Sequence, residues 1–324
     1  MLAALFPFLS LVLERSMFVV CGEALMDVFS TGATPTGVGM DARIGGSPFN
    51  VAVGLARLAQ PACFFGGVSS GFLGERLVAA MRAENVDTRA LHISSAPTTL
   101  GLVGLDAAGV PSYAFYGHQA ADREVPVEAL ARVPADAKVI HVGSFNTVVE
   151  PVAGTLRTLV EREHGRCLIS YDPNIRLNVE PDVARWRDQL QWMLPRTHLL
   201  KVSDEDLSLL YPGVDPEALA KQWLAAGVRL VVVTRGAKGA IGWTAGTRAE
   251  AKPVAVTVID TVGAGDTFQA ALLTWLAERH ALSGAALLAL DAAQLGNALD
   301  FAAKAAAITC SRRGADMPRR NELP

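Results

Sequence analysis

Residues 260–268 read DTVGAGDTF and lead directly into an apolar segment, 268–278, that has the composition of a buried helix. The three small residues at 263–265 leave their peptide N–H groups uncovered, and a helix that begins there adds its positive dipole end. Such a turn can hold an anion such as a phosphate. Because a carboxylate repels phosphate, Asp266 is better suited to take a proton from a hydroxyl that attacks the phosphate. The alternative is an ordinary strand-to-helix turn with Asp266 as its N-cap.

The composition favours a globular protein without a nucleic-acid partner. The chain has 324 residues, of which 51% are apolar, and a net charge of −3. This is enough apolar surface for a large core, and the charge gives no basic patch for nucleic acid. The four cysteines are dispersed, without a C-x-x-C pair, which is typical of reduced thiols in the cytoplasm and not of a zinc site.

The first sixteen residues differ in character from the rest. They contain an apolar run shorter than the ~20 residues that cross a bilayer, and they lack the basic start and the cleavage site of a signal peptide. Met17 then begins MFVVCGE, which is typical of a first buried strand. We expect residues 1–16 to be a non-native or disordered extension, 17–316 to form one domain, and 317–324 to be a C-terminal tail. We expect no membrane partner.

The order of the remaining segments predicts an α/β fold. Strand-like apolar runs alternate with helical spacing, which predicts a mainly parallel sheet covered on both faces; the runs lie at 17–21, 62–66, 139–142, 167–171, 198–202 and 229–233. In two glycine-containing regions, 28–45 and 98–117, polar and apolar residues alternate more loosely. We expect them to form a small β-sheet lid that keeps water from a reactive phosphate. The alternative is that they are antiparallel edge strands of the main sheet.

A second glycine-containing motif lies near the N-terminus. Residues 44–50 read IGGSPFN and precede an apolar helix. Gly45 and Gly46 let a ligand approach the backbone, and Asn50 can donate and accept hydrogen bonds at a polyol. Asp27 follows the first strand, where α/β sheets hold ligand-binding residues, and its carboxylate can accept hydrogen bonds from two neighbouring hydroxyls.

Together these motifs resemble a known family. GGSPFNVAVGLARLA (45–59) and DTVGAGDTFQAALL (260–273) are similar to the two signatures of the ribokinase/PfkB carbohydrate kinases. The resemblance implies ATP-dependent phosphorylation of a sugar hydroxyl. It also implies a ribokinase-like fold, with a central, mainly parallel sheet flanked by helices and a small β-sheet lid. No G-x-x-x-x-G-K-[ST] motif is present, so the chain is not a P-loop enzyme.

The resemblance also implies roles for single residues. Asp266 would be the catalytic base, and the anion hole would consist of Gly263, Ala264 and Gly265. The sugar would be held by Asp27, Gly45, Gly46 and Asn50. The nucleotide would be held by Lys201, Ser203, Thr234, Gly236 and Gly239.

Two metal ions are implied in the same way. The family's N-x-x-E motif, associated with Mg²⁺, falls on residues 203–206, where Ser203 replaces Asn and Asp206 replaces Glu. Asp206 could still act through metal-bound water, since Mg²⁺ keeps much of its hydration shell. A K⁺ ion would lie near the carbonyls of Asp260, Val262 and Gly314.

The identity of the sugar rests on a further motif. Residues 172–176 read DPNIR and resemble the D-P-N-x-R segment of fructokinases and 2-keto-3-deoxygluconate kinases. Arg176 would then contact a phosphate or a substrate oxygen; the alternative is a surface arginine that closes a turn. We predict that the chain converts D-fructose to fructose 6-phosphate. The alternatives are 2-keto-3-deoxygluconate kinase, ribokinase, or, from another class, a sugar-binding regulator without catalysis. Family analogy also suggests a homodimer formed through the lids.

Overall fold

The computed structural model describes residues 16–105 and 111–324. The expectation for residues 1–16 therefore lies outside the described residues, apart from Ser16. The turn of the expected hairpin at 98–117 also falls partly outside them.

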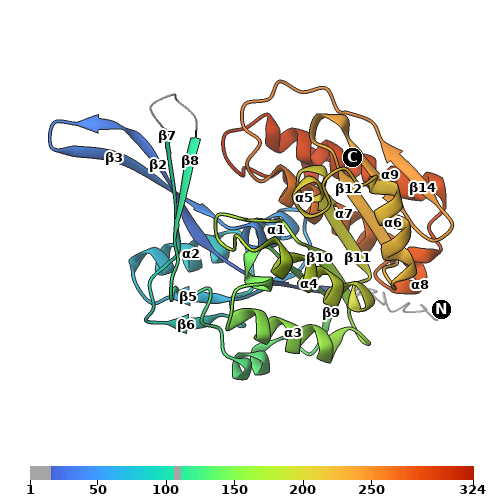
Figure 1. Ribbon diagram of the computed structural model, residues 1–324, viewed down its shortest axis with the longest axis horizontal. Coiled ribbons are helices and arrows are strands. Elements are labelled where there is room, and N and C mark those ends of the chain that lie inside the picture. The colour runs from blue at the N-terminus through green and yellow to red at the C-terminus, as the bar shows by residue number, and fades with distance from the viewer. Residues whose placement is uncertain (1–15, 106–110) are drawn as a thin grey trace, which may run out of the picture.

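An eight-stranded, mainly parallel sheet forms the centre of the molecule (Figure 1). Six strands are parallel, and the last two run antiparallel at one edge. In spatial order the strands are β14 (Arg248–Ala251), β13 (Ala240–Trp243), β12 (Leu230–Thr234), β11 (Leu199–Ser203), β10 (Leu168–Asp172), β9 (Ala137–Gly143), β1 (Met17–Cys21) and β4 (Ala62–Phe65). The predicted α/β class is confirmed.

Helices cover both faces of this sheet because its strands are apolar on both sides. In β1, Phe18 and Val20 contribute to one core, while Val19 and Cys21 contribute to the other. The first core is closed by α1 (Ser47–Arg57), α2 (Phe72–Ala83), α7 (Ala264–Glu278), α8 (Gly284–Leu288) and α9 (Ala292–Cys310). The second is closed by α3 (Val152–Glu163), α4 (Val183–Met193), α5 (Asp204–Leu210) and α6 (Pro216–Ala225).

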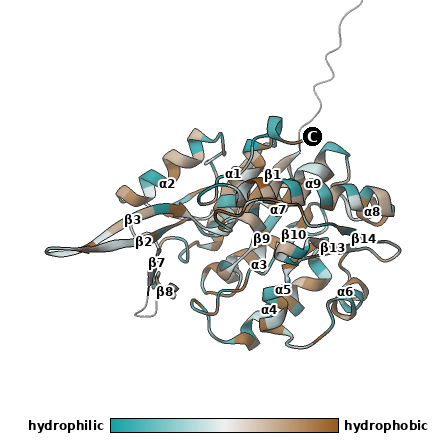
Figure 2. Cartoon of the chain, turned by 90° about the horizontal axis from the view of Figure 1, so that it is seen from above, coloured by the Kyte–Doolittle hydropathy of each residue, from teal (hydrophilic) through white to brown (hydrophobic). Residues whose placement is uncertain are grey.

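A separate four-stranded sheet projects from the body of the molecule, which is clearest from above in Figure 2. It consists of β3 (Gly37–Gly45), β2 (Leu25–Thr34), β7 (Leu100–Leu105) and β8 (Pro111–Tyr116), in that order. The alternative of edge strands on the main sheet is therefore wrong, because β2 pairs only with β3 and β7 among the described strands. We call this sheet the lid.

The remaining elements are short. β5 (Gly67–Ser69) and β6 (His92–Ser94) form a two-stranded sheet. Single 3-10 turns occur at Val127–Arg132, Phe145–Thr147, Leu194–Arg196, Gly236–Lys238 and Arg320–Glu322. In the part of the chain that the structure describes, no helix combines the length and apolarity needed to cross a membrane.

Candidate active site

The turn at residues 260–268 opens α7 and carries no capping side chain. Gly263 is the N-cap residue, with a left-handed backbone at φ 76°, so the alternative in which Asp266 is the N-cap is wrong. Thr267 fixes the turn, because both its N–H and its hydroxyl donate to the Gly263 carbonyl at 2.8 Å. The Ala264 N–H donates within the turn to the Thr261 carbonyl at 3.2 Å. A helix N-terminus without a side-chain cap is suited to bind an anion.

The Asp266 carboxylate lies in the first turn of α7 and is held from the opposite side by α1. Ser47 donates its hydroxyl to Oδ1 at 2.6 Å, and Asn50 donates its amide to Oδ2 at 2.8 Å. Burial raises the pKa of Asp266 above its ordinary value, and these two hydrogen bonds oppose the shift. Since a carboxylate offers about four acceptor positions, each oxygen can still accept a substrate hydroxyl. This is the geometry of an oriented general base.

A buried ion pair lies directly beside the anion-binding turn. Lys201 donates to Asp172 at 2.6 Å, and the two side chains are only 5% and 3% exposed. A Cβ atom on Gly265 would lie 3.2 Å from the Lys201 ammonium, so that charge sits against the backbone of the turn. Burial lowers the pKa of Lys201, but the Asp172 carboxylate outweighs it and the pKa is raised overall. The ammonium therefore stays protonated and adds to the positive potential of the turn.

Asp27 follows β1, as the sequence suggested, and lies in the lid strand β2, where two glycines make room for it. A Cβ atom on Gly45 would lie 2.2 Å from Asp27 Oδ2, and one on Gly101 would lie 2.9 Å from Oδ1. Burial raises the pKa of Asp27 to about 6, with the Arg176 charge opposing and the Asp266 charge adding to the shift. Gly45, which faces Asp27, stands two residues before Ser47, whose hydroxyl binds Asp266, so the sugar-binding and catalytic candidates lie in one site.

Gly46 links the lid to α1 in a conformation that requires glycine. Its φ is 107°, and a Cβ atom there would lie 2.6 Å from the Glu23 carbonyl oxygen. The Glu23 side chain is itself buried beneath this junction, and burial raises its pKa to about 8. Sequence reasoning did not assign Glu23 a role.

Arg176 is exposed, and its guanidinium donates to the Ile175 carbonyl at 2.9 Å. Burial raises the pKa of both Asp27 and Glu23, and the Arg176 charge opposes this shift in each. Arg176 therefore lies on the side of the site where the sugar-binding candidates gather.

The nucleotide candidates follow the ends of two adjacent strands. Ser203 ends β11 and Thr234 ends β12, and the two pair with each other across the sheet. Gly239 has φ 82°, and a Cβ atom there would lie 2.2 Å from the Ala251 carbonyl oxygen, so only glycine allows this close approach. Gly236 has φ 50° with open space around it.

A cavity of about 310 Å³ lies between residues 254–256, which follow β14, and helix α9. Its lining includes Val254, Ala255, Val256, Lys304, Ala307 and Ile308.

Asp206 is bound to its own surroundings. It forms a capping box with Ser203, whose hydroxyl donates to Oδ2 at 2.7 Å, while the Ile175 N–H donates to Oδ1 at 2.8 Å. The carboxylate is 6% exposed and ties β10 to the start of α5. Within residues 16–105 and 111–324, no group of three or more His, Cys, Asp or Glu side chains is arranged to hold a metal.

The three K⁺ candidates are brought together by one carboxylate. Asp260 Oδ1 accepts from the Val262 N–H at 3.0 Å, and Oδ2 accepts from the Gly314 N–H at 2.8 Å. Asp260 thereby joins the turn before α7 to the loop after α9.

Two residues that sequence reasoning missed hold the site in shape. Ser47 orients Asp266, and Asp172 holds Lys201. Both were visible as polar residues within the quoted motifs, Ser47 at the start of a helix and Asp172 at the end of a buried strand. Their partners were not visible, because each partner comes from a distant segment.

Comparisons with known proteins show to which family the chain belongs. The pfkB family carbohydrate kinase model matches residues 15–321. A fructokinase of Rhizobium leguminosarum bv. trifolii is 35% identical over 306 residues, covering 94% of this chain and 92% of that protein. Fructokinase-2 of Solanum lycopersicum is 30% identical and covers 84% and 82%.

Two solved structures are similar along nearly the whole chain. A Xylella fastidiosa fructokinase with bound ATP has a TM-score of 0.84 and 28% identity, covering 96% of this chain and 95% of that one. A Vibrio cholerae O395 fructokinase bound to fructose, ADP and calcium has a TM-score of 0.77 and 26% identity, covering 93% and 94%. The chain therefore belongs to the pfkB family of carbohydrate kinases and is an ATP-dependent sugar kinase.

Proposed function

We propose that this enzyme is a fructokinase that transfers the γ-phosphoryl group of ATP to the 6-hydroxyl of D-fructose. The observation that carries the proposal is the position of Asp266, which is oriented by Ser47 and Asn50 at a helix N-terminus beside the Lys201 ammonium. The names of the relatives at 35% and 30% identity support fructose as the acceptor.

In this proposal the sugar binds between the lid and α1. Asp27 accepts hydrogen bonds from two neighbouring hydroxyls, in the space that Gly45 leaves free. Gly46 brings the backbone close to the sugar, and Asn50 contacts a hydroxyl while it holds Asp266. Arg176 contacts a sugar or phosphate oxygen from the exposed side. These contacts direct the 6-hydroxyl toward Asp266.

The transfer itself needs alignment and charge stabilisation more than covalent chemistry. Asp266 takes the proton of the 6-hydroxyl while the oxygen of that hydroxyl forms a bond to the γ-phosphorus. The bond between the γ-phosphorus and the β,γ-bridging oxygen breaks, and ADP leaves with that electron pair. Amides of the turn at Gly263, Ala264 and Gly265, with Lys201 beside them, stabilise the negative charge on the migrating group, and Ala264 contributes least because its N–H also donates to the Thr261 carbonyl.

We propose that the nucleotide phosphates bind at the ends of β11 and β12, at Ser203, Thr234, Gly236 and Gly239. These residues are small and let the phosphates come close to the backbone. The base would enter the cavity between residues 254–256 and α9, whose apolar lining suits an adenine ring.

Mg²⁺ bound to the ATP phosphates would offset their negative charge during the transfer. Three donors already occupy the Asp206 carboxylate, so we infer that this residue influences the ion only through water. K⁺ binding near Asp260, Val262 and Gly314 remains a prediction, which is tested by comparing activity in potassium and sodium salts.

The proposed substrate is tested by measuring ADP release with fructose, 2-keto-3-deoxygluconate and ribose, each with Mg·ATP. We expect the highest kcat/KM with fructose. Turnover of another sugar without turnover of fructose would overturn the substrate assignment but leave the kinase chemistry intact. No turnover with any sugar, together with measurable sugar binding, would favour the regulator.

Two further properties are part of the proposal. We infer a homodimer formed through the lids, which sedimentation analysis of the purified protein tests. We also infer a cytoplasmic location, because all four cysteines are free thiols in a chain whose relatives phosphorylate sugars with ATP.

A further inference from the structure

The loop that follows α9 lies directly behind the anion-binding turn. The Gly314 N–H donates to Asp260 Oδ2 at 2.8 Å. A Cβ atom on Gly263 would lie 2.6 Å from Ala315 Cβ and 3.0 Å from Ala315 Cα. Ala315 therefore forms the back wall of the turn, and a shift of this loop moves the backbone that faces the transferred phosphoryl group.

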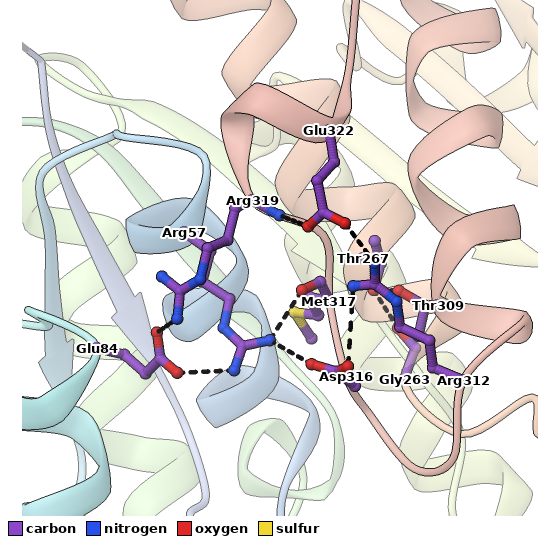
Figure 3. A network of polar contacts seen from close by, with 10 residues as sticks. All are labelled: Arg57, Glu84, Gly263, Thr267, Thr309, Arg312, Asp316, Met317, Arg319 and Glu322. Atoms are coloured by element: carbon purple, nitrogen blue, oxygen red, sulfur yellow. Dashed lines mark hydrogen bonds and ion pairs between the residues drawn. The ribbon is translucent and has the colours of Figure 1, made fainter.

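Arg57 holds this loop from the other side, as Figure 3 shows. Its Nη1 donates to Asp316 Oδ1 and to the Met317 carbonyl, each at 2.8 Å. Its Nη2 donates to Glu84 Oε1 at 2.7 Å. The Arg57 side chain is only 17% exposed, and a planar guanidinium that reaches three acceptors fixes the geometry of what it binds.

The helix that carries Arg57 also carries the residues that orient the catalytic base. Arg57 is the last residue of α1, and Ser47 and Asn50 in the first turn of α1 bind Asp266. Between its first turn and Arg57, helix α1 packs tightly against α7 and the final loop. A Cβ atom on Gly54 would lie 2.8 Å both from Ala270 Cβ in α7 and from Met317 Sδ in the loop. The helix, the loop and the turn thus form one packed unit.

We propose that Arg57 is a positioning residue for phosphoryl transfer. It touches neither sugar nor nucleotide, and it acts by holding residues 314–317 against the turn at 260–263. The amides of that turn and the Asp266 carboxylate then keep the alignment that in-line transfer requires, for which a displacement of about 1 Å is costly. This role concerns the kinase reaction itself and does not depend on which sugar is the acceptor.

The test compares Arg57→Met with Arg57→Lys in steady-state assays. We expect Arg57→Met to lower kcat by about tenfold or more while the sugar KM changes by less than about twofold, because alignment is lost and sugar contacts remain. Arg57→Lys should recover part of kcat, since a lysine can reach one acceptor of the loop but cannot bind three in a plane. A kcat within twofold of wild type for Arg57→Met would overturn the proposal.

Two controls separate positioning from general stability. Arg319→Met removes another arginine that binds Glu84, at 3.2 Å, and whose side chain is 59% exposed. Glu84→Gln removes the charge partner of Arg57 but leaves both contacts to the loop. We expect kcat near wild type for both variants, and a lower unfolding midpoint for Glu84→Gln. A loss of kcat in Glu84→Gln equal to that in Arg57→Met would show that stability alone is responsible.

A second variant keeps the test valid if Arg57→Met does not fold. Asp316→Ala removes one of the two loop contacts while the Met317 carbonyl remains, so we expect a smaller fall in kcat, of about threefold, at unchanged sugar KM. In the double variant that combines Asp316→Ala with Arg57→Lys, kcat should fall by less than the product of the two single falls. Both substitutions act on the same contact between residues 57 and 316. Full additivity, or an effect on sugar KM alone, would contradict the proposal.

Discussion

The proposed sugar side and the proposed phosphoryl side of the candidate active site are built in opposite ways. On the proposed sugar side, space is created by leaving side chains out: Gly45 and Gly101 flank Asp27, and Gly46 lets the backbone pass close to the Glu23 carbonyl. On the phosphoryl side, bare amides are supported by added charges, above all the pair of Lys201 and Asp172. A substitution on the first side should therefore change substrate affinity, whereas one on the second should change rate and stability.

The largest effect is expected from Asp266→Asn, which belongs to the phosphoryl side. An amide cannot accept the hydroxyl proton, so we expect kcat to fall by about 10²-fold or more. Sugar binding, measured by calorimetry without nucleotide, should be largely kept. Retained turnover would mean that another group removes the proton, and lost sugar binding would mean that the two sides are not separable.

Lys201→Met should combine loss of rate with loss of stability. It leaves the Asp172 carboxylate buried without its partner, so we expect the free energy of unfolding to fall by about 3–5 kcal/mol, measured by urea denaturation. The matched control is Lys221→Met, which removes an exposed lysine that binds Glu217 at 2.9 Å. That variant should leave the denaturation midpoint unchanged. Equal effects of the two variants would contradict a special role for the buried pair.

Gly45→Ala tests the sugar side by filling the space beside Asp27. The new methyl group would lie 2.2 Å from Asp27 Oδ2 and must displace the carboxylate. We expect the sugar KM to rise about tenfold with a smaller change in kcat, since the lost contact is made in both the ground state and the transition state. Gly104→Ala is the control, because a Cβ atom there meets nothing within 4 Å. A fall in kcat alone would contradict the comparison.

The smallest effect concerns pH and sharpens the role of Asp27. Burial raises its pKa to about 6, so the carboxylate that we propose accepts the sugar hydroxyls is lost as the pH falls through 6. At pH 5 about a tenth of it remains ionised, and sugar affinity should be up to about tenfold weaker than at pH 7. Calorimetric titration of the nucleotide-free enzyme with the sugar at the two pH values measures this difference in affinity. The same titration with Asp27→Asn should give weak binding that is independent of pH over this range.

The parts of the site that could be predicted from the sequence are those with local sequence patterns. Gly46, Asn50, Asp266 and the bare turn lie in short motifs at helix starts, where local chemistry is visible in the order of residues. The α/β class followed from the alternation of strand and helix patterns, and the lid from its looser alternation. The patterns that predict these features are local, although the strands themselves pair over long stretches of the chain, as β2 does with β7.

The supporting contacts could not be predicted, because each joins segments far apart in the chain. Ser47 and Asp266 are 219 positions apart, and Arg57 and Met317 are 260 positions apart. Which faces of α1, α7 and the final loop meet is decided by packing in the core. The resemblance assigned Asp206 to a metal, but its contact with the Ile175 N–H, 31 positions away, became visible only in the structure.

The position of the final loop has a consequence for biosynthesis. Ala315 backs the anion-binding turn, and Leu323 lines the cavity proposed for the base. A nascent chain therefore holds every described strand of the main sheet and of the lid by residue 251, yet the turn at 260–263 gains its support only when Ala315 has left the ribosome. We expect prematurely terminated products that end before Gly314 to retain the proposed sugar-binding residues without transferring phosphate.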